Sequence, residues 1–304
     1  MKNIKRRFFI KSSSLIAGGL VLPSFKIERM ANNVNNKKLK VSVIGCGGRG
    51  TGAAVQALRA DDNVELIAMA DAFEDRLENS LAAIKEEMDG EKTIDVKDKN
   101  RFTGFNGYKK AIDLADVVIL ATPPGFRPLH FKYAIDNDKH VFMEKPVATD
   151  ANGVRQVLKT AKDAQQKKLN VVVGLQRRYQ FSYLNILKQV RRGVIGKITS
   201  GQVRWNGAGV WVRGRKPNQT EMEYQMRNWY YFNWLCGDHI VEQHIHNIDV
   251  ANWFLNEYPV SAQGMGGREV RKGIDHGEIF DHHFVEFKYA SGAIISSQCR
   301  HQPG

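Results

Sequence analysis

Two acids and a histidine stand at helical spacing in the second half of the chain. If residues 239–256 form one helix, Glu242, His246 and Asp249 share a face and His244 points elsewhere. A carboxylate one turn from an imidazole orients it and raises its pKa toward neutrality, which suits a general base for an alcohol proton. The alternative is a histidine that only satisfies polar groups in the core, and Asp249 is either substrate-binding or structural.

A glycine cluster marks a second chemical site. The strand pattern Leu39–Ile44 runs into Gly45-Cys46-Gly47-Gly48-Arg49-Gly50, and residues 51–59 follow with the apolar spacing of a helix. In this order the glycines allow a tight turn, a close approach of a diphosphate, and close packing of helix on strand. Free N–H groups at a helix N-terminus bind phosphate. The pattern predicts a dinucleotide site, with an ordinary loop and helix as the alternative.

An acid follows at the spacing expected for ribose recognition. The strand pattern 64–70 ends at Asp71, which stands 21 residues beyond Gly50. A carboxylate there accepts hydrogen bonds from the ribose diol and repels a 2′-phosphate. The cofactor is therefore predicted to be NAD rather than NADP, although Arg49 and Arg76 keep NADP open.

Elements with strand and helix patterns alternate through the first half. This rhythm predicts an α/β fold with an open, doubly wound parallel sheet and right-handed crossovers. The breaker cluster Thr122-Pro123-Pro124-Gly125 is expected to line the cofactor crevice at a strand end, and 88–100 reads as a solvated loop. The expected elements are strands at 116–121, 140–143 and 170–174, helices at 126–136 and 150–166, and, in the second half, strands at 260–265, 283–289 and 293–298.

Four features in a fixed order resemble the Gfo/Idh/MocA oxidoreductases. They are the glycine cluster, Ala121-Thr122-Pro123-Pro124, Glu144-Lys145-Pro146, and the segment 237–249 with its His-Asn-Ile-Asp run. The resemblance covers Lys40 to the C-terminus. It implies a Rossmann domain, placed at 38–168, and a second α/β domain, placed at 169–304, whose open, mostly antiparallel sheet faces the nicotinamide and supplies the substrate site.

The resemblance also assigns roles to residues. It implies that His246 is the catalytic histidine and that Lys145, at a strand end beside the crevice, orients the substrate hydroxyl and favours loss of its proton; a solvated lysine is the alternative. Glu242 stands where the family usually has Asp, which leaves the role of this acid and the substrate class open. The expected cofactor-binding residues are Gly45, Gly47, Gly48, Arg49, Gly50, Asp71, Thr122, Pro123, Glu144 and Lys145.

Candidate substrate residues come from two further segments. Gln176-Arg177-Arg178-Tyr179 lies where similar proteins begin to line the substrate pocket, and four of the five tryptophans fall between 205 and 234. Aromatic faces suit the C–H surface of a sugar ring. Exposed charges and core or interface packing are the alternatives. The expected substrate contacts are Arg177, Tyr179, Trp234 and Asp249.

The charge of the chain is concentrated at its start. The net charge is +13, but residues 1–40 carry +9 and the other 264 residues only +4. A nucleic-acid partner is therefore not expected for the folded part. The start itself, Lys5-Arg6-Arg7-Phe8-Phe9-Ile10-Lys11 before an apolar stretch, is typical of a twin-arginine export signal; a basic tail with a buried helix is the alternative. We expect a signal and linker over 1–37, a periplasmic protein, and no membrane span in the mature chain.

The cysteines and histidines of the chain could form cross-links or bind a metal. Three widely spaced cysteines do not form a disulfide framework. Several histidines crowd the second half, but neither zinc-protease spacing occurs, so no metal is expected. If a metal were required, its ligands would be Asp238, His239, Asp281 and His282.

These features predict an NAD-dependent oxidoreductase that moves a hydride from a secondary alcohol of a sugar, glycoside or cyclitol to tightly bound NAD. A second possibility is a glycosidase that works by transient oxidation and elimination, and a third is an inactive nucleotide-binding paralogue. The chain stops as its last candidate strand ends, so we expect a C-terminally incomplete sequence with an exposed sheet edge that favours a homo-oligomer.

Overall fold

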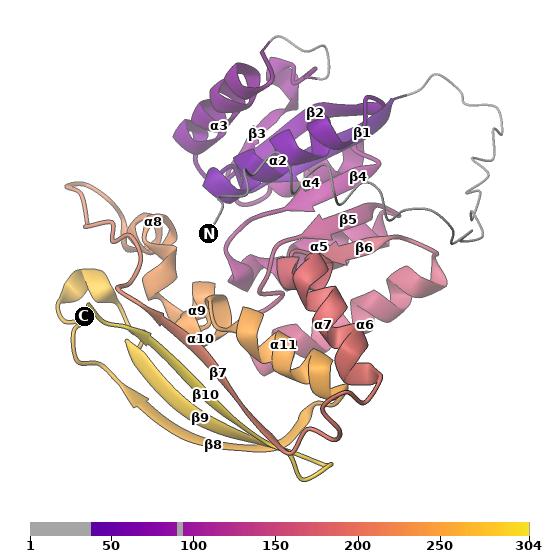
Figure 1. Ribbon diagram of the computed structural model, residues 1–304. Coiled ribbons are helices and arrows are strands. Elements are labelled where there is room, and N and C mark those ends of the chain that lie inside the picture. The colour runs from indigo at the N-terminus through magenta and orange to yellow at the C-terminus, as the bar shows by residue number, and fades with distance from the viewer. Residues whose placement is uncertain (1–37, 90–93, 304) are drawn as a thin grey trace, which may run out of the picture. The chain divides into compact units, whose positions relative to one another are not determined.

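A computed structural model describes residues 38–89 and 94–303 (Figure 1). The predicted export signal and linker at 1–37 lie outside these residues. The first half forms a six-stranded sheet in the order β3-β2-β1-β4-β5-β6, with every pair parallel. This confirms the doubly wound sheet. Its strands are β1 (Leu39–Ile44), β2 (Val64–Asp71), β3 (Arg101–Thr103), β4 (Val117–Leu120), β5 (His140–Met143) and β6 (Val171–Val173).

Helices cover both faces of this sheet. Helices α2 and α3 pack on one face around Leu58, Leu77 and Ile84, and α4, α5 and α6 pack on the other around Phe131 and Ile135. Both faces of the parallel strands are therefore buried, which is why the strands read as unbroken apolar runs. The helices are α2 (Gly48–Ala60), α3 (Glu74–Glu87), α4 (Gly107–Leu114), α5 (Arg127–Asp136) and α6 (Ala151–Gln166).

Two expectations for the first half need correction. Strand β6 completes the first sheet, so this half ends after Val173 rather than at the expected boundary of 168. Within the segment expected to be a loop at 88–100, Ile94 bridges to Leu66 of β2 and Asp98–Asn100 form a 3-10 helix. Helices α3 and α4 and strand β3 were not predicted. The order of strands reverses between β1 and β4, and their carboxyl ends open the crevice where ligands bind in such sheets.

The second half forms a four-stranded sheet in the order β7-β10-β9-β8. Strands β7 and β10 are parallel and the other pairs antiparallel, which confirms the mostly antiparallel sheet. Helix α11 packs on one face through Ala251 and Leu255. Elsewhere on the strands Val260 and Met265 are exposed. The strands are β7 (Ser200–Gly207), β8 (Pro259–Gly267), β9 (His282–Tyr289) and β10 (Ile294–His301).

The second half also contains short helices: η3 and α7 link the two sheets, and the others lie between β7 and β8. These helices carry Glu242, His246 and the four candidate substrate residues. No helix in the described ranges combines the length and the apolar character needed to cross a bilayer. The cysteines Cys46, Cys236 and Cys299 are buried and unpaired. The helices are η3 (Gln176–Tyr179), α7 (Phe181–Arg191), α8 (Glu221–Arg227), η4 (Trp229–Tyr231), α9 (Asn233–Cys236), α10 (Asp238–Glu242) and α11 (Ile245–Leu255).

Candidate active site

The glycine cluster forms the turn that the sequence predicts. Gly45 has φ +95°, a conformation that L side chains rarely adopt. A Cβ on Gly50 would lie 1.9 Å from the carbonyl oxygen of Gly45, so only glycine lets α2 pack this close to the turn. A Cβ on Gly47 or Gly48 would meet nothing within 4 Å. The helix therefore begins with free N–H groups facing open space, which is the cradle that a diphosphate needs.

Asp71 ends β2 beside this turn. Its Oδ2 accepts the N–H of Cys46 at 2.7 Å and its Oδ1 accepts the N–H of Phe73 at 2.9 Å. These two hydrogen bonds fix the carboxylate at the rim of the glycine loop. Burial raises the pKa of Asp71, and the backbone hydrogen bonds oppose that shift. The carboxylate is thus held in position for a ribose diol.

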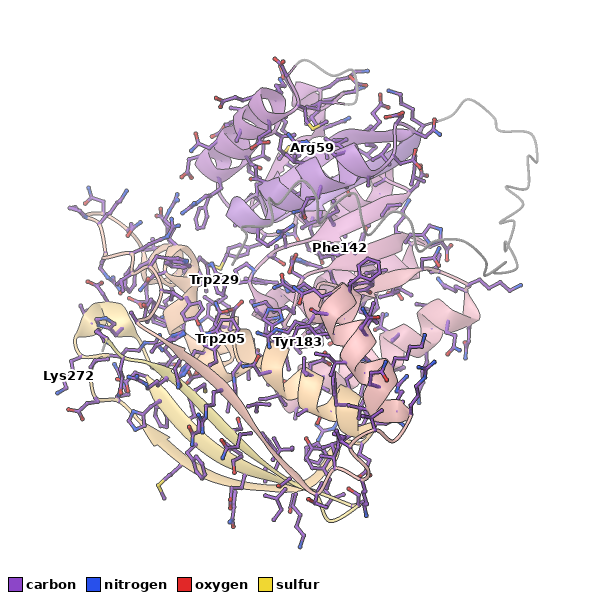
Figure 2. The ribbon with its side chains drawn as sticks, viewed as in Figure 1. Arg59, Phe142, Tyr183, Trp205, Trp229 and Lys272 are labelled. Atoms are coloured by element: carbon purple, nitrogen blue, oxygen red, sulfur yellow. The ribbon has the colours of Figure 1, made fainter. Side chains whose placement is uncertain are left out.

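A cavity of about 560 Å³ runs from the glycine loop to the second half of the chain. Three of the ten expected cofactor-binding residues, Gly50, Glu144 and Lys145, do not line it, and the other seven do: Gly45, Gly47, Gly48, Arg49, Asp71, Thr122 and Pro123. The opposite wall was not predicted. It comes from the second half, and Figure 2 shows one of its residues, Trp229, at the edge that faces the first sheet. The residues of that wall are Trp211, Arg213, Met226, Arg227 and Trp229.

Arg227 joins this wall to the first half. Its guanidinium makes two hydrogen bonds to the carboxylate of Asp75, at 2.9 and 3.0 Å, and lies 4.0 Å from the ring centroid of Phe73. Asp75 lies in the first turn of α3 and Phe73 just precedes that helix. The contact therefore holds the far wall of the cavity across the ribose end of the groove.

We expect Arg227→Ala to speed the release of bound dinucleotide by about 3- to 10-fold, because it removes an ion pair and a cation–π contact together worth about 1 kcal/mol. The rate of release into a trap of excess unlabelled cofactor measures this. Arg59→Ala is the matched control, since Arg59 pairs with Glu87 of α3 at 2.8 Å away from the cavity lining (Figure 2). Equal rates in both variants would contradict the role given to Arg227.

The segment after β5 places the candidate lysine. Arg127 is buried and donates to the carbonyl oxygens of Glu144 at 2.9 Å and Pro146 at 3.0 Å, and also to that of Thr122. It thereby fixes the backbone around Lys145. Glu144 pairs with Arg49 at 2.9 Å, which links this segment to the glycine loop.

Lys145 contacts the second half of the chain directly. Its Nζ donates to the carbonyl oxygen of Glu242 at 2.5 Å and to Oε1 of the same residue at 2.8 Å. Both side chains are largely buried. The structure thus joins two of the three predicted catalytic residues, which stand 97 positions apart in the sequence.

The predicted pairing of Glu242 with His246 is wrong. Helix α10 ends at Glu242 and α11 begins at Ile245, so 239–256 is not one helix. Glu242 turns to Lys145 instead. The pKa of His246 is lowered to about 4, not raised, because of burial first and then the positive charges of Lys145 and Arg177.

His246 is a neutral imidazole in a buried, aromatic environment. Its ring stacks against Trp205 with centroids 6.1 Å apart, and the guanidinium of Arg177 lies 5.8 Å from the centroid of the same indole. Within the described residues its Nδ1 has no hydrogen-bond partner. Figure 2 shows Trp205 and Tyr183 on neighbouring elements of this region. The ring therefore offers an unused proton acceptor close to the charge of Lys145.

The other predicted substrate residues are placed differently. Asp249 accepts two hydrogen bonds from Arg178, at 2.7 and 2.9 Å, so it ties α11 to η3. Trp234 donates to Gln225 at 2.7 Å and packs on Phe126, which lines the dinucleotide cavity. Tyr179 is 64% exposed. Of the predicted substrate set, Arg177 and Asp249 are close enough for their charges to affect His246: Arg177 lowers the pKa of its ring and Asp249 raises it.

Buried neutral histidines predict acid sensitivity. The pKa values of His244, His246 and His301 are lowered to about 4, chiefly by burial. Since an unfolded histidine titrates near about 6.5, the unfolded chain binds more protons between pH 6.5 and 4. The free energy of unfolding therefore falls as the pH falls through this window, by up to about 1.4 kcal/mol per pH unit for each histidine.

Melting temperatures measured from pH 7 to pH 4.5 test this expectation. His244→Gln is expected to show a shallower fall, because the amide cannot be protonated and still reaches Ser297, which bonds His244 Nε2 at 2.8 Å in the native protein. A melting temperature that does not change between pH 6.5 and 4.5 would show that these rings bind protons equally in both states.

Comparisons with known proteins agree with this geometry. The family model described as "Oxidoreductase family, NAD-binding Rossmann fold" matches residues 39–173. A second model, the GFO/IDH/MocA C-terminal domain, matches residues 183–302. The two matches meet near the passage from the first sheet to the second.

Individual relatives are more distant. Inositol 2-dehydrogenase of Rhizobium meliloti is 27% identical over 247 residues, which are 81% of this chain and 64% of that protein. A glycosyl hydrolase family 109 protein of Shewanella is 25% identical over 248 residues, 75% of this chain and 50% of that protein. The chain thus spans about half to two-thirds of the length of these relatives. The crystal structure of myo-inositol 2-dehydrogenase from Lactobacillus plantarum matches this chain with a TM-score of 0.65 at 24% identity, over 86% of this chain and 69% of that one. At this identity the match supports a shared fold only.

Proposed function

The chain belongs to the Gfo/Idh/MocA oxidoreductases, and from that membership we propose that it oxidises a secondary alcohol of a sugar, glycoside or cyclitol with NAD. The observation that carries the proposal is the contact between Lys145 and Glu242. It brings the end of the NAD-binding sheet to the segment that carries His246. We place the nicotinamide beside this proton acceptor and this cation, although neither His246 nor Lys145 lines the dinucleotide cavity.

The residues around the crevice fit a dinucleotide. The open N-terminus of α2 at Gly47 and Gly48 suits the diphosphate, and the fixed carboxylate of Asp71 suits the ribose. NAD is preferred over NADP because a carboxylate repels a 2′-phosphate, although Arg76 and Arg213 also line the cavity. When bound, NAD supplies the acceptor for the hydride that leaves the alcohol carbon.

The protein's own residues handle the proton. As the alcohol becomes a ketone, its C–H bond yields a hydride and its O–H bond yields a proton. Nδ1 of His246 accepts that proton, because it is neutral and has no partner among the described residues. Lys145 donates a hydrogen bond to the substrate oxygen and stabilises the negative charge that develops there. Glu242 pairs with Lys145 at 2.8 Å and so orients its ammonium group.

A second activity would use the same site. Oxidation at one sugar carbon acidifies its neighbour, so a glycosidic group can be eliminated, water added, and the carbon reduced again. The similarity to a glycosyl hydrolase family 109 protein favours this alternative. The proton acceptor and the cation serve both directions of its redox step, and the elimination also needs a base for the carbon-bound proton and an acid for the leaving oxygen.

Cofactor analysis of the purified protein tests both activities. The protein is denatured after incubation with inositols, free sugars and glycosides, and the released dinucleotide is identified with its redox state. Accumulated NADH with a ketone product supports net oxidation. Release of the aglycone without NADH supports the eliminating glycosidase. If NAD is bound, no compound reduces it and no product forms, the result supports an inactive nucleotide-binding paralogue.

We further propose export by the twin-arginine route to the periplasm and a homo-oligomeric state. The support for export is the run Lys5-Arg6-Arg7 before an apolar stretch, which lies outside the described residues. The support for association is the exposed apolar side chains of the second sheet, such as Val260 and Met265. Cell fractionation and light scattering test the two points; cytoplasmic retention or a monomer would refute them.

A further inference from the structure

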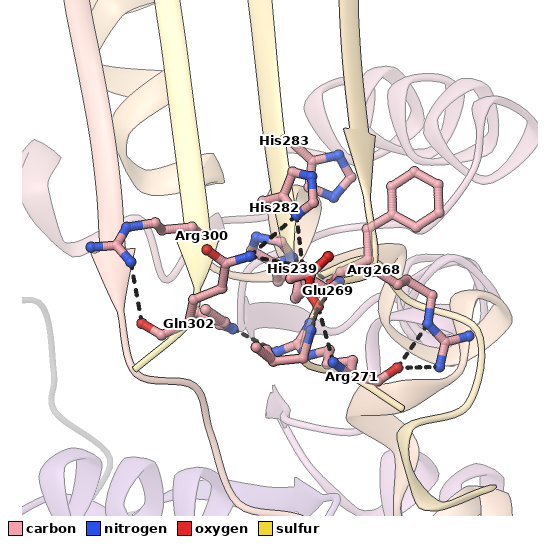
Figure 3. A network of polar contacts seen from close by, with 12 residues as sticks. His239, Arg268, Glu269, Arg271, His282, His283, Arg300 and Gln302 are labelled. Carbon is pink, nitrogen blue, oxygen red and sulfur yellow. Dashed lines mark hydrogen bonds and ion pairs between the residues drawn. The ribbon is translucent and has the colours of Figure 1, made fainter. Parts of the chain in front are cut away.

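A cluster of possible metal ligands lies apart from the dinucleotide cavity. Asp238, His239 and His283 each offer one donor atom, and these atoms all lie within 4.8 Å of one another. Asp238 and His239 open α10, whereas His283 is the second residue of β9. The cluster therefore joins two elements that are distant in the sequence. The ring centroids of His239 and His283 lie 4.8 Å apart, and Figure 3 shows both residues in the network of polar contacts at the end of the second sheet.

The cluster has a carboxylate at its centre and unused imidazole nitrogens around it. Oδ1 of Asp238 lies 3.0 Å from Nδ1 of His239 and 3.4 Å from Nε2 of His283. The His239 side chain is fully buried. Within the described residues, Nε2 of His239 has no hydrogen-bond partner, and Nε2 of His283 has only the 3.4 Å approach to Asp238. Buried nitrogens without a partner are costly unless something binds them.

The backbone holds the carboxylate in a conformation that needs support. Gly237 and Asp238 both have positive φ, 75° and 68°. For a residue other than glycine this costs free energy and is found where the side chain must be placed in one direction. The N–H of Phe280 donates to Oδ2 of Asp238 at 2.8 Å, and Nδ1 of His239 lies 3.1 Å from the Phe280 carbonyl oxygen. One backbone segment thus orients both side chains, as outer partners of metal ligands do.

One member of the cluster borders a second cavity. A volume of about 450 Å³ is lined by His283 together with His282 and Cys299. Asp238 and His239 do not line this cavity, so His283 is the member of the cluster that faces it.

We propose that Asp238, His239 and His283 bind one divalent transition-metal ion, for which Zn²⁺ is the best chemical match. Two imidazoles and one carboxylate suit zinc, and three protein ligands leave a fourth position for water. The simple alternative is that the two histidines only share the carboxylate through hydrogen bonds, which would make the cluster independent of metal.

The ion would act on the position of α10. This helix carries Asp238 and His239 at its start and Glu242 at its end. By joining α10 to β9, the metal would fix the residue that accepts hydrogen bonds from Lys145. This inference goes beyond the proposed function, because it concerns binding and stability and holds whatever substrate the protein uses.

Metal content and thermal stability of the full chain, prepared without a histidine tag, test the proposal. After removal of metal with EDTA, equilibration with Zn²⁺ and dialysis, we expect about one zinc per chain and a higher melting temperature with zinc than without it. His283→Ala is expected to weaken zinc binding by about 100-fold or more, since loss of an outer partner alone costs about 10- to 100-fold.

His282→Ala is the matched control. His282 precedes His283 on the same strand, is half-exposed, and bonds instead to Asp281 at 2.7 Å. We expect this variant to keep one zinc. Folding is checked in EDTA, where His283→Ala and the native chain are expected to melt at the same temperature.

Three results would overturn the proposal. The first is less than about a tenth of an ion per chain with a melting temperature that zinc does not change. The second is an equal loss of zinc in the two variants, which indicates binding at the surface. The third is a His283→Ala protein that melts at a lower temperature than the native chain in EDTA, because His283 would then act through packing alone.

Discussion

Replacing His246 by alanine is expected to lower kcat by about 10²- to 10⁴-fold, the usual contribution of a positioned acid or base. The bound NAD content should not change, because His246 does not line the dinucleotide cavity. The fall in kcat is expected because Nδ1 of His246 is a proton acceptor with no partner among the described residues and lies near the charge of Lys145. Single-turnover reduction of the bound cofactor measures the chemical step directly, and KM is expected to change less than kcat.

His244→Gln is the control for this loss. His244 stands two residues earlier and is equally buried, but its Nε2 is engaged by Ser297. We expect this variant to keep most of its activity, and added imidazole to restore part of the rate of His246→Ala only. If His246→Ala kept a near-native kcat, His246 would not be the proton acceptor, and the proposed mechanism would be wrong at this step.

Gly50→Ala is expected to reduce the bound dinucleotide by at least about 10-fold, since a shift of the phosphate-binding turn removes several hydrogen bonds worth about 1.4 kcal/mol or more in total. The added Cβ would lie 1.9 Å from the Gly45 carbonyl oxygen, so α2 or the turn must move. The melting temperature should fall as well. Absorbance of the cofactor released from the denatured protein gives its content per chain.

Gly52→Ala in the same helix is the matched control. Its Cβ would meet only the Arg49 side chain, at 3.8 Å. We expect this variant to keep its cofactor. Its free energy of unfolding should rise by about 0.5–1 kcal/mol, because alanine is a better helix former than glycine. If Gly50→Ala behaved like Gly52→Ala, the close approach of α2 to the turn would not be needed for binding.

The first sheet was predictable because its strands are buried on both faces and therefore read as apolar runs. Strand β7 was missed, since every second residue of it is exposed and its partner β10 lies more than 90 residues later. The break between α10 and α11 was missed for a similar reason. The Glu242 carbonyl oxygen accepts a hydrogen bond from Lys145. The N–H of His246 donates to the carbonyl oxygen of Gln243 at 3.4 Å. The spacing of residues within this segment cannot predict a break caused by a lysine 97 positions away.

The sequence predicted individual residues of the candidate site better than it predicted the contacts between them. The glycine turn and the placement of Asp71 beside it match the predicted geometry, and the roles of Lys145 and Glu242 stay predictions. The pKa of His246 was given the wrong direction, because the shift depends on burial and on cations from other segments. The pair Arg227 and Asp75 could not be foreseen, as 152 residues separate two charges that each look like ordinary surface groups.

The wall formed by Trp211, Trp229 and Arg227 has a consequence for turnover. A dinucleotide enclosed between both halves of one chain would serve as a prosthetic group and not as a cosubstrate drawn from a surrounding pool. Electrons taken from one sugar would then have to leave through the same opening by which the sugar entered. The pocket must therefore admit a donor and an acceptor in turn, and its specificity would be a compromise between two molecules.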